Sequence, residues 1–137
     1  MAPRFSAVLG LVAAAAMVLP ATAATPKSGK FSGSTKQGKS VSFKVTSGGK
    51  VKKVKFGFKG RCENGATTTG TVSMPGPFTV NDGKFNAQSA GGTFVKGSFT
   101  SGSKAKGKLR QRSSSFDPIS LRQVTCTSGK VRWTAKR

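Results

Sequence analysis

The sequence predicts an all-β protein: a single antiparallel β-sandwich or barrel-like domain of about eight strands, with one disulfide, preceded by a cleaved signal peptide. Three observations predict this fold class. Apolar and charged residues alternate along short segments, turn strings such as the NDG at 81–83 recur at short intervals, and no helical periodicity follows residue 24. Alternation with a period of two is the pattern of strands that bury one face, and regularly spaced turns are typical of sandwiches and barrels.

Residues 1–23 have the pattern of a secretory signal peptide. Arg4 gives a positive start, an apolar run follows at 7–19, and small residues at 21–23 suit cleavage. The run is shorter than the about 20 apolar residues of a spanning helix, so we expect no transmembrane anchor and a secreted, extracellular protein. We expect residues 24–29 to be a flexible N-terminus and residues 30–137 to form one β-sandwich domain.

The strands are predicted from apolar residues at alternate positions. Val41, Phe43 and Val45 alternate with polar residues, and the last segment alternates in the same way around Trp133. The expected strands lie near 30–35, 40–46, 51–61, 66–73, 77–80 with 84–88, 93–100, 104–112 and 130–136. The side chains on the apolar parity predict a core of Phe43, Val45, Val54, Phe56, Phe58, Phe99, Leu109, Val131 and Trp133.

Three segments carry weaker or more local signals. The 66–73 segment has almost no apolar residues, which predicts an edge strand or a poorly covered one. The NDG at 81–83 suits a two-residue hairpin turn whose central residues need positive φ. The stretch 111–125 lacks clear alternation, so we expect a long connection that could be partly strand.

Cys62 and Cys126 are the only cysteines, and an even number in an exported chain predicts a disulfide. Cys62 shares the inward parity of Phe58. A bond between the two would close a loop of about 65 residues, for which the chain-entropy treatment gives about 4 kcal/mol. A catalytic cysteine would need a base or a resolving thiol, and the chain contains no histidine.

The residue inventory argues against an enzyme. The chain has no histidine, no tyrosine and only three acids, Glu63, Asp82 and Asp117. Each acid stands beside glycine or proline at a turn, which explains its position without catalysis. We therefore expect no catalytic residues, no metal site and no cofactor.

The strongest functional signal is positive charge on the outward parity of three predicted strands. The chain has 24 Lys and Arg residues and a net charge of +21. If two of these strands are neighbours, their cations stand about 5 Å apart, and a bound anion would stabilise the face. The predicted polyanion-binding residues are Lys53, Lys55, Lys59, Arg61, Lys104, Lys106, Lys108, Arg110, Arg112, Lys130 and Arg132. The alternative is a solvated face that prevents aggregation.

The kind of anion can be narrowed from the aromatic residues. Proteins that bind single-stranded nucleic acid place aromatic side chains among the cations, so that bases can stack on them. The phenylalanines of the clear strands fall on the apolar parity, so we expect no sequence-specific nucleic-acid binding. Phosphate backbones and anionic envelope polymers remain as partners, and their binding would be sensitive to salt.

Four strings of the sequence, taken in order, resemble a group of small secreted proteins of high-GC Gram-positive bacteria. They are FSGSTKQGKSVSFKV at 31–45, FGFKGRC at 56–62, FVKGSFTSGSKAKGKLR at 94–110 and CTSGKVRWTAKR at 126–137. The last string, with its cysteine, Ser-Gly turn and alternating apolar residues, is the most specific. The resemblance implies an extracellular β-sandwich with one disulfide and brings no activity, cofactor or functional residue.

The sequence thus predicts a secreted, monomeric, non-enzymatic binding or structural module that associates electrostatically with anionic polymers. One alternative is a protein-partner module, an inhibitor or adhesion domain acting through 111–125, whose charge serves only solubility. A cationic antimicrobial protein is a third candidate, but such activity usually requires an amphipathic helix, and none is expected here.

Overall fold

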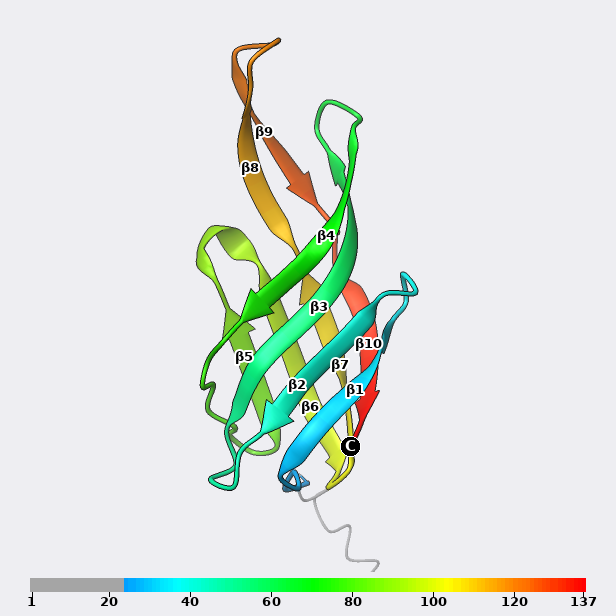
Figure 1. Cartoon of the computed structure of the whole chain (residues 1–137), viewed down its shortest axis with the longest axis vertical. Helices are drawn as coiled ribbons and strands as arrows, with labels where there is room; N and C mark the ends of the chain where they lie inside the picture. The colour runs from blue at the N-terminus through cyan, green and yellow to red at the C-terminus, as the bar shows by residue number, and fades with distance from the viewer. Residues whose placement is uncertain (1–23) are drawn as a thin grey trace, which may run out of the picture.

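The computed structural model describes residues 24–137, so the predicted signal peptide at 1–23 lies outside the described residues. Apart from one short 3-10 helix, η1 (Ala90–Gly92), the regular structure is β (Figure 1). The strands are β1 (Gly29–Thr35), β2 (Ser40–Val45), β3 (Val51–Cys62), β4 (Thr67–Met74), β5 (Lys84–Gln88), β6 (Phe94–Ser101), β7 (Lys104–Arg110), β8 (Arg112–Asp117), β9 (Arg122–Thr127) and β10 (Val131–Lys136). The all-β prediction is confirmed.

The ten strands form one continuous antiparallel sheet, not two separate sheets. Its order is β5-β6-β7-β10-β1-β2-β3, with β4 on the other edge of β3. Beyond the end of β2, the last residues of β3 pair with β9 instead, and β9 in turn pairs with β8. β4 pairs with β3 alone, as an edge strand does, which agrees with its nearly apolar-free sequence.

The sheet curls around a single aromatic core. Phe43 on β2 and Phe85 on β5 have ring centroids only 5.4 Å apart. Five ladder steps of about 4.8 Å would separate these strands by about 24 Å in a flat sheet. The strands β1 to β4 accordingly lie in front of β5, β6 and β7 in Figure 1. Every residue of the predicted core is buried, from Val54 at 0 % exposure to Phe58 at 7 %.

Two glycines permit the curvature. A Cβ on Gly33 would lie 1.9 Å from the carbonyl oxygen of Thr134, and one on Gly107 would lie 1.8 Å from that of Lys96. No other residue type allows neighbouring backbones to approach so closely, and glycine often marks a tight bend in a strand for this reason. Gly33 thus allows β1 to approach β10, and Gly107 allows β7 to approach β6.

The predicted disulfide is present and attaches a projecting hairpin to the body. Cys62 and Cys126 are 64 positions apart in the sequence, and they are register partners on β3 and β9. Their Cα atoms are 3.9 Å apart. The bond therefore joins β3 to β9, at the base of the hairpin that β9 forms with β8.

Three local features differ from or refine the expectation. The segment 111–125 is not a long connection, because 112–117 and 122–127 form β8 and β9. Gln111 ends the ladder of β7 by exchanging hydrogen bonds with Ser128: its N–H donates to Oγ at 2.8 Å and its carbonyl accepts from N at 3.0 Å. The segment 77–80 forms only an isolated bridge between Phe78 and Val51.

The NDG turn has the predicted geometry. Asp82 and Gly83 have φ values of 50° and 69°, and the backbone groups of Asn81 and Lys84 are hydrogen-bonded to each other in both directions at 2.9 Å. This is the pairing of a tight hairpin turn with two positive-φ residues.

Gly107→Ala tests whether the close approach of backbones sustains the curl. The added methyl group would force β6 and β7 apart, and overpacking of this kind costs about 1–3 kcal/mol. We expect a loss of that size in the free energy of unfolding, measured with urea. The matched control is Lys106→Ala, an exposed substitution at the preceding position, which should change stability by no more than about 0.5 kcal/mol. Equal effects of the two substitutions would contradict the role given to Gly107.

Candidate anion-binding face

The pairing of β6, β7 and β10 aligns cations across the outer face of the sheet. Lys96 on β6 is the register partner of Lys108 on β7, and Lys108 is also the partner of Arg132 on β10. All three side chains are exposed. Directly opposite residues in an antiparallel ladder have Cβ atoms about 5 Å apart. We call Lys96, Lys108 and Arg132 the cross-strand row.

Further cations lie on the same two central strands. Lys104 is opposite Lys136, and Lys106 is opposite Thr134 on one side and Ser98 on the other. Like charges opposite each other cost about 0.2–1 kcal/mol per pair, and physiological salt screens only beyond about 8 Å. The face therefore holds repulsion that a bound anion would relieve.

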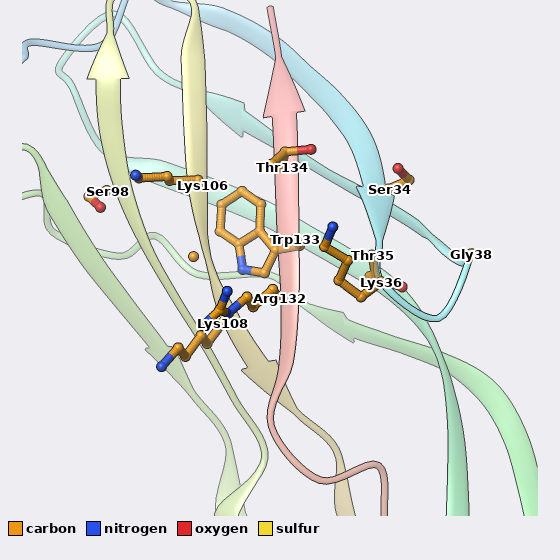
Figure 2. Close-up of a pocket in the computed structure, with 11 residues that line it drawn as sticks. Ser34, Thr35, Lys36, Gly38, Ser98, Lys106, Lys108, Arg132, Trp133 and Thr134 are labelled. Carbon is orange, nitrogen blue, oxygen red and sulfur yellow. The ribbon is translucent and has the colours of Figure 1, made fainter.

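A groove of about 640 Å³ lies over β10 beside the cross-strand row. Figure 2 shows Lys106, Lys108 and Arg132 on one side of the β10 ribbon and Lys36 on the other. The hydroxyl groups of Ser34, Ser98 and Thr134 also line the groove, and no carboxylate does. Ammonium, guanidinium and hydroxyl donors without an acceptor of negative charge are the groups that bind phosphate or sulfate oxygens.

The three acids of the chain lie away from this face. Glu63 is in the turn after β3, Asp82 is in the turn before β5, and Asp117 ends β8. The backbone N–H of Ile119 and the hydroxyl of Ser120 donate to the Asp117 carboxylate, and these bonds lower its pKa below the ordinary value. Asp117 is therefore charged at neutral pH, but at the far end of the β8–β9 hairpin.

The structure brings together only part of the predicted set. Lys104, Lys106, Lys108 and Arg132 lie on the paired strands β7 and β10. The second group, on β3, is separated from β10 by β1 and β2, which corresponds to about 14 Å along the sheet. It consists of Lys55, Lys59 and Arg61.

The β3 group also differs in its neighbours. Lys55 is opposite Ser42 and Ser73, and Lys59 is opposite Thr69. These lysines face hydroxyl groups instead of other cations. The β3 group therefore lacks the like-charge repulsion of the cross-strand row.

Lys53, which was predicted in the outward group on β3, is exposed but lies at an irregularity of the strand. Its φ is 52°, and the register between β2 and β3 shifts at this point. An extra residue in β3 forms a β-bulge, which breaks the alternation. Lys52 is instead the register partner of Lys44.

The last three predicted residues differ from these cations in their surroundings. Nε of Arg110 donates to the carbonyl of Gly92 at 3.1 Å, and its guanidinium carbon lies 5.0 Å from the ring centroid of Phe94. Arg112 lies on β8 opposite Thr127, because the chain changes partner at Gln111. Lys130 is exposed in the turn before β10.

Sequence reasoning missed Lys96, Lys36 and the position of Phe94. Lys96 alternates with the inward-facing Val95 and Gly97, so its parity could have identified it. Phe94 shares the parity of Lys96 and is only half-buried, with Nζ of Lys96 5.1 Å from its ring centroid. The expectation that all strand phenylalanines face inward is therefore wrong at this position. Lys36 is in a turn, where parity gives no signal.

Comparisons with known proteins return no match: no family model, curated protein or solved structure is significantly similar to the chain. No helix in residues 24–137 is long and apolar enough to cross a membrane. In the same residues, no group of three or more His, Cys, Asp or Glu side chains is placed to hold a metal ion.

Lys108→Gln tests the repulsion within the cross-strand row. Removing the central charge relieves two like-charge pairs, so we expect the free energy of unfolding to rise by about 0.5–1 kcal/mol in low-salt urea titrations. Lys59→Gln makes the same chemical change opposite Thr69 and should leave stability nearly unchanged. The difference should disappear near 1 M salt, where screening acts within about 3 Å. A stability gain that is equal for both variants would contradict the proposed repulsion.

Proposed function

We propose that the protein is a non-enzymatic binding module that associates electrostatically with anionic polymers such as envelope polyanions and phosphate backbones. The observation that carries this proposal is the cross-strand row of Lys96, Lys108 and Arg132, which lies beside a groove without a carboxylate. Binding a polymer with repeated negative charges would offset the repulsion along the row and release counterions.

The proposal extends to where and how the domain works. Residues 1–23 would be removed as a signal peptide, and the domain would act outside the cell as a monomer. The disulfide between Cys62 and Cys126 supports an oxidising compartment. We propose no catalytic step and no cofactor.

The geometry favours a contact with charged backbone groups over reading of individual bases. Trp133 lines the groove but is buried, at 2 % exposure. Phe94 and Phe78, the aromatics beside the cross-strand row, are both half-buried, and two cations lie over Phe94. Base stacking on single strands relies on several accessible aromatic side chains, so sequence-specific recognition of nucleic acid is not part of the proposal.

The binding test compares two variants that each lose three positive charges. In the groove variant, Gln replaces Lys106, Lys108 and Arg132. In the β3 variant, Gln replaces Lys55, Lys59 and Arg61. On heparin or polyphosphate columns, we expect the groove variant to elute at clearly lower salt than the β3 variant. The slope of log affinity against log salt should fall by about 2–3 for the groove variant, at about 0.7–0.9 per lost phosphate contact.

Two results would contradict the proposal. Equal shifts of the two variants would mean that total charge, and not the groove, governs retention. Retention by a natural partner that persists at high salt, with no effect of either variant, would favour the protein-partner alternative in which the charge serves only solubility.

A further inference from the structure

The tip of the β8–β9 hairpin carries exposed apolar side chains. Phe116, Ile119 and Leu121 are 58 %, 93 % and 73 % exposed, and they are the large hydrophobic residues that the described part of the chain leaves in solvent. Scattered exposed hydrophobics are ordinary. Here all three fall within six residues at one end of the molecule, a clustering that is typical of interaction sites.

The hairpin is an arm that holds this tip away from the body. β8 pairs only with β9, and the ladder to β3 consists of two pairs at the base of the arm, Arg61 with Thr127 and Cys62 with Cys126. The arm extends beyond the rest of the sheet in Figure 1. The apolar tip therefore contributes nothing to the core, and its exposure needs another explanation.

Two donors of the turn at the tip are satisfied within the turn itself. The N–H of Ile119 donates to Oδ1 of Asp117 at 2.9 Å, and the hydroxyl of Ser120 donates to Oδ2 at 2.9 Å. Pro118 has no N–H to satisfy. Such a turn can enter a less polar medium at a lower cost in desolvation free energy, because fewer of its backbone N–H groups depend on water for a hydrogen bond.

The backbone of the turn is also unusual for an ordinary solvated loop. Leu121 has a φ of 56°, a conformation that favours glycine or asparagine and is rare for a bulky side chain. Turns in water are usually built from Gly, Asn, Asp or Ser at such positions. A leucine held here at a conformational cost is consistent with use of its side chain outside the fold.

We propose that the tip formed by Phe116, Ile119 and Leu121 inserts into the head-group region of an anionic lipid bilayer. This inference rests on the proposed function and names the bilayer surface as the anionic partner. The chain carries 24 cations against three acids, and cationic proteins are attracted to anionic leaflets. Asp117, the one acid on the arm, is the register partner of Arg122, so the two charges offset each other beneath the tip.

Three side chains are too few for permanent anchoring. Stable association with a bilayer generally takes two signals, such as a short apolar insertion together with a basic surface. The arm supplies the first signal and the cationic outer face supplies the second. Binding should consequently require anionic lipid and be reversed by salt.

The experiment measures binding of the intact, disulfide-bonded protein to vesicles of equal parts phosphatidylglycerol and phosphatidylcholine. Replacing Phe116, Ile119 and Leu121 together by Ser should weaken vesicle binding by about tenfold or more. Because the tip contributes nothing to the core, the variant should keep the wild-type urea midpoint and elute from heparin at the wild-type salt concentration. Vesicles of phosphatidylcholine alone should bind neither protein appreciably.

A second variant reports insertion directly. Phe116→Trp should shift its fluorescence to shorter wavelength on the anionic vesicles, relative to the unchanged signal of buried Trp133. Vesicle binding that is unaffected by the serine substitutions, or no spectral shift, would overturn bilayer insertion and point to a protein partner for the tip. The proposed function is tested separately, by the heparin retention of the groove variant. A failure of anion binding can therefore be distinguished from a failure of bilayer insertion.

Discussion

The fold depends on the packing of Trp133 against a part of the sheet where glycine residues leave room for its ring. A Cβ on Gly97 would lie 2.7 Å from the indole and 2.6 Å from the ring of Phe85, so only glycine leaves room for both rings. The Trp133 ring centroid is 5.8 Å from that of Phe43 and 6.2 Å from that of Phe85. These contacts join β10 to β2 on one side of the sheet and to β5 on the other. Nε1 of Trp133 is buried and makes no hydrogen bond within the described chain, which costs about 1–3 kcal/mol.

The curl of the sheet around this core determines which face of the sheet carries the cationic side chains. Because side chains alternate along each strand, placing Leu109, Val131 and Trp133 inside places Lys108 and Arg132 outside. The register of β7 with β10 then makes these two cations direct neighbours. The repulsion is a consequence of the same pairing that closes the core. It cannot be removed by a small shift in register, because a one-residue slip would expose the whole apolar set.

The sequence was sufficient to predict the core and the alternation, because each strand has to bury one face of its own. It was not sufficient where the geometry depends on a second strand. The bulge at Lys53 follows from the pairing of β3 with β2, and the run of lysines around it gives no indication of where the extra residue lies. The pairing of β10 with β1 and with β7 could not be deduced either, because these strands are far apart in the sequence. The β8–β9 hairpin was missed for a different reason. An arm that projects into solvent has no core to face, so the serines at 113–115 have no reason to alternate with apolar residues.

A comparison of the cross-strand row with the β3 group shows why total charge is a poor guide to a site. Lys55 and Lys59 on β3 stand opposite Ser and Thr, whose hydroxyl groups impose no electrostatic cost. Lys108 stands between two cations, so part of the folding free energy is spent on holding them together. An anion gains ordinary attraction at the first group, whereas at the second it also relieves repulsion already present in the free protein. If the protein binds anions as proposed, the free energy gained per charge would therefore be larger at the cross-strand row, although the two groups have similar composition. Strand register thus determines which cations of a uniformly basic sequence stand directly opposite one another, at the cross-strand row and again at Lys30, Lys44 and Lys52.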